Sequence, residues 1–199
     1  MDSLWDNPLD SLDHTLFLAI NAGAEPPAAL VALAVLAARF VIVLVPLHIA
    51  LVWAGGDREM RTVALASVLA LVTACAVNQV IGLVAYVPRP FVIGLGHTLI
   101  EHRPSSSFPS NHATVFFAYA AVLALFGRRG LALSVACLGL LVACSRIYLG
   151  IHFPLDMLGA ALVGPLAAVA AVPAVRRFRR RPPARPQRTG APRAQARSA

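Results

Sequence analysis

Residues 131–175 read LALSVACLGLLVACSRIYLGIHFPLDMLGAALVGPLAAVAAVPAV. The two apolar runs in this stretch, 131–149 and 155–175, each approach the roughly 20 residues that a helix needs to cross a bilayer. The segment where they meet, 145–156, holds an arginine, a histidine and an aspartate. Ionisable side chains in or beside a bilayer are costly, so this cluster indicates a functional site in a membrane protein.

The composition of the 199-residue chain also indicates a membrane protein. Hydrophobic residues make up 58% of it and charged residues only 13%, which is outside the usual range of soluble domains. The net charge of +8 describes one tail, because nine of the 17 Lys and Arg residues lie between Arg176 and Arg197. All 17 are arginines, so arginine must supply any fixed cation that a site needs.

The apolar segments predict an all-α integral membrane protein with about five transmembrane helices and an N-terminal amphipathic helix at the membrane interface. The N-terminal helix is expected at 9–23, where leucines recur at helical spacing but the apolar part is too short to span. Pro165 and Pro173 are expected to bend the last span. One membrane domain is expected over 1–175, with spans at about 28–54, 62–87, 111–127, 131–149 and 155–175.

Arginines in short loops predict the orientation, because cytoplasmic flanks of transmembrane helices are enriched in Lys and Arg. When five spans are counted, the hairpin at 55–61, the turn at 128–130 and the tail from residue 176 share one side, which is predicted to be cytoplasmic. The tail, 176–199, is rich in Arg and Pro and is predicted to be disordered and to contact anionic lipid. A nucleic-acid arm is the alternative, but no aromatic residue beyond Phe178 supports it, and we expect no nucleic-acid partner.

The same span count brings three polar clusters to one depth on the outer side: Pro88-Arg89-Pro90, Ser110-Asn111-His112 and the segment 145–156. An arginine fork can bind two oxygens of a phosphate at once, and the N-terminus of a helix offers unpaired N–H groups to an anion. The clusters therefore predict a phosphate site. Its expected phosphate ligands are Arg89, Ser110, Asn111 and Arg146.

Two histidines are predicted to divide the chemistry. His152 precedes Asp156 by one helical turn, so the carboxylate can fix its tautomer and leave the other ring nitrogen free to attack phosphorus. His112 has no carboxylate in its motif and is the candidate proton donor to the leaving oxygen. A phosphohistidine intermediate would result. Carboxylates are too few for a magnesium cage, so no metal and no cofactor are expected. Alone, each motif is also compatible with an ordinary helix cap or a local hydrogen bond.

Together the motifs resemble the type 2 phosphatidic acid phosphatase superfamily of integral membrane lipid phosphatases. The matching residues are Arg89-Pro90, then Pro109-Ser110-Asn111-His112, then Ser145-Arg146 with His152 and Asp156. The resemblance implies that His152 is the nucleophile, Asp156 its partner and His112 the acid, with Arg89, Ser110 and Arg146 binding phosphate. Gly82 stands where the first motif of the family has a lysine.

The segment from Arg89 to Ser110 looks most like the bacterial undecaprenyl-diphosphatase branch, in which that lysine is commonly absent. This resemblance implies a membrane phosphatase for undecaprenyl diphosphate in a bacterial-type plasma membrane, with an extracytoplasmic site and a cytoplasmic carboxyl terminus. His97, His102 and Arg103 of the outer loop, residues 88–110, are candidates for binding the second phosphate. The alternatives are a phosphatase for phosphatidate, phosphatidylglycerophosphate or lipid A, and a membrane transporter whose charges line a pathway.

Overall fold

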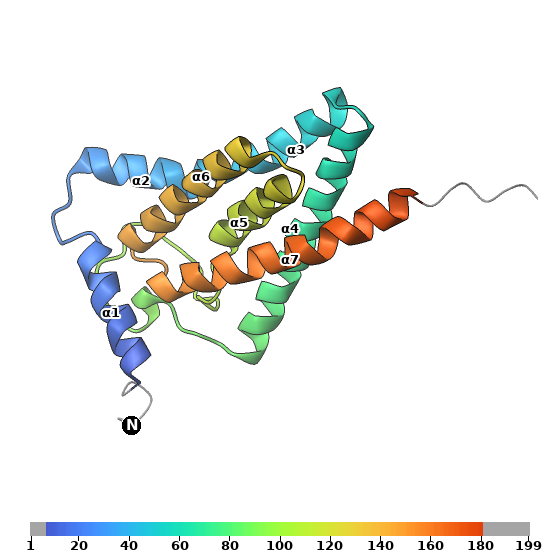
Figure 1. The fold of residues 1–199 in the computed structure, drawn as a ribbon. Coiled ribbons are helices and arrows are strands. Elements are labelled where there is room, and N and C mark those ends of the chain that lie inside the picture. The colour runs from blue at the N-terminus through green and yellow to red at the C-terminus, as the bar shows by residue number, and fades with distance from the viewer. Residues whose placement is uncertain (1–6, 181–199) are drawn as a thin grey trace, which may run out of the picture.

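The computed structural model describes residues 7–180, and all regular structure in that range is helical (Figure 1). Four helical stretches are long and apolar enough to cross a membrane, and one further apolar helix is shorter. The predicted all-α membrane fold is therefore confirmed. The elements are α1 (Pro8–Ile20), α2 (Ala28–Phe40), the 3₁₀ turn η1 (Val41–Val43), α3 (Leu44–Gly55), α4 (Arg58–Val84), the 3₁₀ turn η2 (Pro90–Val92), α5 (Asn111–Leu125), α6 (Arg129–Tyr148) and α7 (Pro154–Arg180).

The first span runs through α2, η1 and α3 as one stretch, Ala28–Gly55. Pro46 in the first turn of α3 has no N–H to donate, and its ring crowds the carbonyl of Ile42 four residues earlier. Ile42 lies in η1, where the helix tightens into 3₁₀ geometry. The proline therefore accounts for the change of helix type inside this span.

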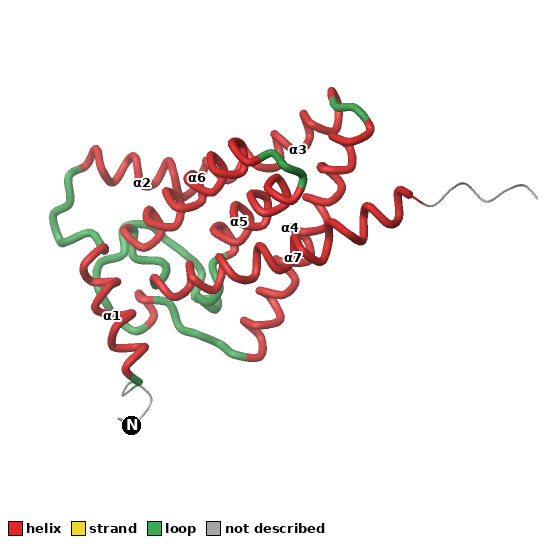
Figure 2. The backbone as a smooth tube through the Cα atoms, viewed as in Figure 1, coloured by secondary structure: helices red, strands yellow, loops and turns green. Residues whose placement is uncertain are grey.

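The short helix α5 lies in the middle of the bundle, packed against α4, α6 and α7 (Figure 2). Its 15 residues are few for a bilayer crossing, but neighbouring helices rather than lipid surround it, so its ends need not reach the membrane surfaces. Gly164 of α7 allows α5 and α7 to approach closely, because a Cβ there would lie 2.7 Å from the backbone nitrogen of Ala118. Small residues of this kind let membrane helices pack backbone against backbone.

Several helix ends depart from the predicted bounds by two to four residues. α4 begins at Arg58 instead of 62, because the Asp57 side chain accepts a hydrogen bond from the N–H of Met60 at 2.8 Å. It ends at Val84 instead of 87. α1 ends at Ile20 instead of 23, and α5 ends at Leu125 instead of 127.

The last helix corrects the predicted boundary of the tail. Pro165 and Pro173 both lie inside α7, which continues to Arg180 instead of ending at 175. Prolines are tolerated in membrane helices because neighbouring groups re-satisfy the freed carbonyls. Residues 176–180 therefore belong to a helix and not to a disordered tail, and the rest of the predicted tail lies outside the described residues.

Helix α1 lies across the ends of α6 and α7 rather than along them (Figure 1). Its buried residues, Asp13 and Phe17, face the bundle, whereas Leu9, Leu12 and Leu16 are exposed. An exposed apolar face on a helix that crosses the ends of the spans fits an interfacial position. The end of the bundle that α1 covers is also the end where the three polar clusters lie.

Candidate active site

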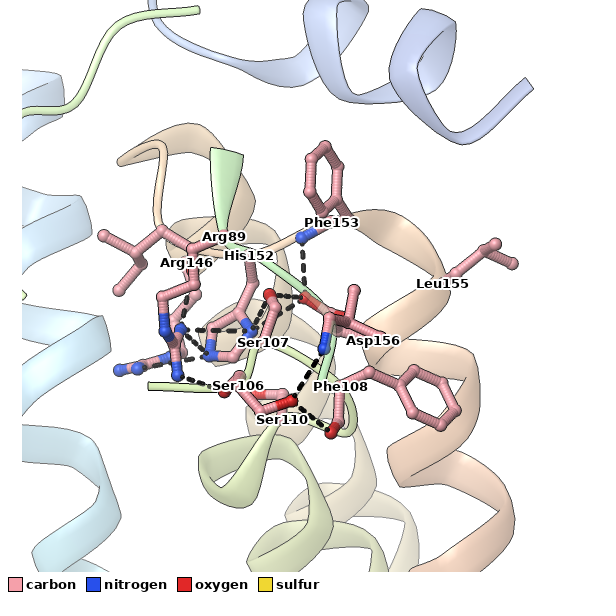
Figure 3. A network of polar contacts seen from close by, with 12 residues as sticks. Arg89, Ser106, Ser107, Phe108, Ser110, Arg146, His152, Phe153, Leu155 and Asp156 are labelled. Atoms are coloured by element: carbon pink, nitrogen blue, oxygen red, sulfur yellow. Dashed lines mark hydrogen bonds and ion pairs between the residues drawn. The ribbon is translucent and has the colours of Figure 1, made fainter. Parts of the chain in front are cut away.

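A buried pair, His152 and Asp156, stands at the centre of a polar network (Figure 3). His152 lies in the turn between α6 and α7, and Asp156 lies in the first turn of α7. The Nδ1 of His152 is 2.9 Å from the Oδ2 of Asp156, and the N–H of Phe153 donates to the same oxygen at 2.8 Å. The predicted pairing across one helical turn is thus present in the structure.

Two arginines approach the other ring nitrogen of His152. The Nη1 of Arg89 lies 3.0 Å and the Nη2 of Arg146 lies 3.4 Å from Nε2. A guanidinium only donates, so Nε2 is the acceptor, and an ionised carboxylate only accepts, so Nδ1 carries the hydrogen. This network therefore selects the tautomer whose Nε2 lone pair faces the arginines.

The surroundings keep His152 neutral. Burial lowers the pKa of its imidazole well below the usual value, and the charges of Arg146 and Arg89 lower this pKa further. A protonated imidazole has no lone pair to give, so neutrality is what a nucleophilic role requires.

Arg89 is held by backbone groups of the outer loop. Its Nε donates to the carbonyl of Ser105 at 3.0 Å, Nη2 donates to the carbonyl of Ser106 at 3.0 Å, and Nη1 donates to the carbonyl of Ile151 at 2.7 Å. The Oγ of Ser105 lies 3.3 Å from Nη2. With the contact to His152, these partners use all five N–H groups of the guanidinium. A phosphate can gain a bond from Arg89 only by replacing one of them, and Nε2 of His152 is the partner that phosphate would cover.

Arg146 and Ser110 each carry a buried polar atom without a hydrogen-bond partner among residues 7–180. These atoms are Nε of Arg146 and Oγ of Ser110. Ser110 is the N-cap of α5 and fully buried, yet its hydroxyl does not cap the helix. Buried polar groups in proteins are nearly always paired, so these two atoms are available to an anion bound beside His152.

The other two predicted residues on α5 differ in their surroundings. His112 lies close enough to Arg146, His152 and Arg89 to interact with them electrostatically. The amide oxygen of Asn111 instead accepts a hydrogen bond from Nδ2 of Asn78 on α4 at 2.9 Å. The structure thus brings His112 to the site and ties the Asn111 side chain to the neighbouring helix.

Ser107 belongs to the network although the sequence motifs did not identify it. Its hydroxyl donates to Oδ2 of Asp156, and its Oγ lies 3.3 Å from Nδ1 of His152 (Figure 3). It is the last of three consecutive serines, 105–107, and nothing in the sequence distinguishes it from the other two. Only the path of the loop shows which serine meets the aspartate.

Of the three outer-loop residues predicted to bind a second phosphate, the structure brings only His102 to the site. Its Nε2 lies 3.3 Å from Nη2 of Arg146. The side chains of His97 and Arg103 are exposed. His97 instead uses its backbone, because its N–H donates to Oδ1 of Asn21 at 2.7 Å and its carbonyl accepts from Nδ2 of Asn21 at 2.9 Å.

Helix α1 braces the turn that carries His152. Asp13 accepts a hydrogen bond from the N–H of Leu155 at 2.9 Å, which caps the start of α7 from another helix. Asn21 donates to the carbonyl of Tyr148 at the end of α6 at 3.0 Å. Burial raises the pKa of Asp13 to about 6, and the hydrogen bond from Leu155 opposes this rise.

The space beside Gly82, where the family motif has a lysine, is filled by the outer loop. A Cβ at position 82 would lie 3.1 Å from the Cβ of Ser106, and the carbonyl of Ser106 is one of the groups that hold Arg89. A side chain at this position would press against Ser106, which would have to shift by a few tenths of an ångström. The site therefore relies on its arginines for positive charge.

Two guanidinium groups and one carboxylate form the buried centre of the site, so its fixed charge suits an anion. Within residues 7–180, no three His, Cys, Asp or Glu side chains are grouped so that they could hold a metal ion. Metal-free chemistry stays a prediction that a chelator must test.

An apolar groove of about 500 Å³ opens between α2 and α6. Its lining includes Ser145 and Tyr148, the residues on either side of Arg146 and Ile147 in the sequence. Arg146 itself reaches the α2 wall, where its Nη1 donates to the carbonyl of Ala38 at 3.4 Å. The charged site and an apolar surface thus lie next to each other.

Comparison with known proteins gives consistent matches. A family model described as the PAP2 superfamily matches residues 62–180. The protein YbjG of Escherichia coli (strain K12) is 33% identical over 163 residues, which are 82% of this chain and 82% of YbjG. The undecaprenyl-diphosphatase BcrC of Bacillus subtilis (strain 168) is 32% identical over 152 residues, 76% of this chain and 78% of BcrC.

A solved structure has the same fold. The crystal structure of LpxE from Aquifex aeolicus superimposes with a TM-score of 0.66 at 25% sequence identity. The match covers 85% of this chain and 98% of LpxE. The arrangement of the helices is therefore shared over most of the chain, and about a quarter to a third of the aligned residues are identical.

Proposed function

The chain belongs to the PAP2 superfamily and is a membrane lipid phosphatase, and we propose that its substrate is undecaprenyl diphosphate. The reaction would release the terminal phosphate and leave undecaprenyl phosphate, the carrier lipid for peptidoglycan and other cell-envelope synthesis. The 32% sequence identity to the undecaprenyl-diphosphatase BcrC, which extends over most of both chains, supports this substrate. The apolar groove next to Arg146 agrees with a head group whose long tail stays in the bilayer.

The observation that carries the proposed chemistry is the setting of His152, whose Nδ1 is held by Asp156 while Nε2 faces two arginines. In the first step the Nε2 lone pair attacks the terminal phosphorus. The bridging P–O bond breaks, and its electrons leave with undecaprenyl phosphate. The arginine N–H groups that contacted Nε2 now donate hydrogen bonds to phosphoryl oxygens. The Nδ1 proton stays in its hydrogen bond to Asp156.

The second step removes the phosphoryl group from His152. A water attacks phosphorus, the N–P bond breaks, and inorganic phosphate leaves. His112 is the proposed acid and base. It gives a proton to the leaving oxygen in the first step and takes one from the attacking water in the second. Arg89, Ser110, Asn111 and Arg146 are the proposed phosphate ligands, and Nε of Arg146 and Oγ of Ser110 have no other hydrogen-bond partner among the described residues.

The proposed location is a bacterial-type plasma membrane, with the site on the extracytoplasmic side and the carboxyl terminus in the cytoplasm. The arginines at 128–129 and 176–179 lie at the end of the bundle opposite the site, which supports this orientation. A head group would then reach Arg146 from the outer leaflet without its tail leaving the bilayer.

Phosphate release by the purified protein tests both substrate and chemistry. We expect the highest kcat/KM for undecaprenyl diphosphate, in a set that includes phosphatidate and phosphatidylglycerophosphate, with a chelator present throughout. His152→Ala should lower kcat by about 10³-fold or more, because it removes the nucleophile. Substrate labelled with ³²P in the terminal phosphate should give the wild type an acid-labile, alkali-stable protein label that the variant lacks.

Each alternative has its own outcome in this experiment. Full activity in His152→Ala would refute the nucleophile, and activity that returns only with added divalent metal would refute metal-free chemistry. A higher kcat/KM for phosphatidate or phosphatidylglycerophosphate would replace the proposed substrate. Movement of lipid between leaflets without phosphate release would instead favour a transporter. His97→Ala, an exposed imidazole of the outer loop, is the matched control.

A further inference from the structure

A third imidazole, that of His102, lies at the site and has no part in the two steps described above. The rings of His102 and His152 meet edge to face with centroids 6.4 Å apart. The Nη2 of Arg146 lies 3.3 Å from Nε2 of His102 and 3.4 Å from Nε2 of His152. One guanidinium nitrogen thus contacts both imidazoles, and an anion bound by that nitrogen lies within reach of both.

The backbone of the outer loop orients the His102 ring. Its Nδ1 lies 3.0 Å from the carbonyl of Arg103. Because a carbonyl only accepts and a guanidinium only donates, Nδ1 carries the hydrogen in the neutral ring and Nε2 faces Arg146. Nε2 of His102 is therefore aimed at the site in the same manner as Nε2 of His152, although it has no carboxylate partner to make it a nucleophile.

We propose that His102 binds the phosphate nearer to the lipid tail and so gives the site its preference for lipid diphosphates over lipid monophosphates. This inference rests on the proposed function, in which His152 attacks the terminal phosphate. The leaving group is then the inner phosphate. Nη2 of Arg146 contacts Nε2 of both His152 and His102, so the inner phosphate of a lipid whose terminal phosphate lies at His152 can extend toward His102.

The chemistry of His102 suits this role. Burial lowers the pKa of His102, and the charges of Arg89 and Arg146 lower it further. A bound diphosphate brings negative charge that counteracts the two arginines and favours the protonated ring. Protonated His102 keeps its bond to the Arg103 carbonyl and donates from Nε2 to an oxygen of the inner phosphate. A lipid monophosphate has no inner phosphate, so it can offer His102 only the ester oxygen that joins its phosphate to the lipid.

Two substrate pairs that differ by one phosphate test the proposal. They are undecaprenyl diphosphate with undecaprenyl phosphate, and diacylglycerol diphosphate with phosphatidate. His102→Ala in the full-length purified protein should lower kcat/KM for both diphosphates by about 10- to 100-fold, the effect of losing one hydrogen bond to a charged group. The values for both monophosphates should stay within about twofold, as for a substitution away from the bound groups.

Inhibitor binding gives a readout that does not depend on turnover. His102→Ala should raise the inhibition constant of methylenediphosphonate, a diphosphate that cannot be cleaved at its bridge, and leave that of inorganic phosphate unchanged. His97→Ala and Arg103→Ala are matched controls, because both side chains are exposed in the same loop. Neither should change any of these constants.

The outcomes separate this inference from the proposed substrate. An equal fall for diphosphates and monophosphates, with both inhibition constants changed alike, would overturn the role of His102 and leave the proposed function standing. A selective loss for diacylglycerol diphosphate, in an enzyme that hydrolyses undecaprenyl diphosphate poorly, would sustain His102 and reject the proposed lipid. If the wild type hydrolyses neither diphosphate in preference to its matched monophosphate, the proposed preference for diphosphates is wrong.

Discussion

Some residues of the site have a polar atom without a hydrogen-bond partner, and in others every polar atom has one. Arg146 and Ser110 each have one unpartnered buried atom among the described residues, whereas every N–H of Arg89 has a partner. Arg89 is therefore held in place by its hydrogen bonds and can orient Nε2 of His152 before a phosphate binds. Arg146 can donate to the phosphate from Nε without first breaking a hydrogen bond there. Preorganisation of this kind avoids reorganising the site during the reaction.

Ser107 is predicted to act on the chemical step through Asp156. Ser107→Ala removes the hydroxyl that donates to Oδ2 of Asp156, and a lost hydrogen bond to a charged group costs about 1.5–3 kcal/mol, or roughly 10- to 100-fold in rate. We expect kcat for undecaprenyl diphosphate to fall within that range while KM changes little, because Ser107 contacts none of the proposed phosphate ligands. Steady-state kinetics measures both constants.

Ser134→Ala provides the control for the loss of a hydroxyl. Ser134 is exposed on α6, and its hydroxyl donates to the carbonyl of Gly130 in its own helix at 3.2 Å. Its replacement should leave both constants unchanged. A raised KM with unchanged kcat in Ser107→Ala would instead assign Ser107 to substrate binding.

At the scale of elements, α1 and the outer loop hold the turn before α7. The Asp13 to Leu155 hydrogen bond joins residues 142 positions apart, and Phe17 packs against Phe153 with ring centroids 5.2 Å apart. The sequence predicted α1 as an amphipathic helix, because that pattern is local. It could not predict which residues of the helix would meet α7, since no local pattern encodes a contact over that separation.

The stability of this brace is predicted to depend on pH through Asp13. Burial raises the pKa of Asp13 from 3.8 to about 6 in the folded protein, so the folded state binds this proton more tightly than the unfolded state. The stability that Asp13 contributes is thus fully present below its unfolded pKa of about 4 and is lost as pH rises through 6. Asp13→Asn keeps an oxygen for the Leu155 N–H and removes the titration.

Thermal unfolding in detergent checks this prediction. The Tm of the wild type minus that of Asp13→Asn should fall as pH rises from about 4 to 7. Taking the difference removes the titration of groups common to both proteins. Asp10→Asn, which removes a less buried carboxylate from the same helix, is the control for the loss of charge. A difference that rises with pH would show that ionised Asp13 stabilises the folded state.

Over the whole molecule, the spans and the three motifs could be predicted because hydropathy and motif spacing are local properties. Counting spans then placed the motifs at one end of the bundle, where the structure has them. The path of the outer loop could not be predicted in this way. It decides that Ser107 rather than a neighbouring serine meets Asp156, that His102 rather than His97 reaches Arg146, and that Ser106 fills the space beside Gly82.

The orientation of the whole molecule is the last prediction. A reporter that is active only in the cytoplasm should be active when it is fused after Ala199 or inserted at Gly56 in the α3–α4 hairpin. It should be inactive at Gly94 in the outer loop, where no atom lies within 4 Å of an added Cβ. A reporter that is active only outside the membrane should give the reverse pattern.

The physical reason is that arginine-rich flanks are retained on the cytoplasmic side, and the outer arginines, Arg89 and Arg146, are instead buried in the site. Cytoplasmic activity at Gly94 with external activity at the other two positions would show that the molecule has the opposite orientation. The site would then face the cytoplasm, and it would draw its substrate from the inner leaflet.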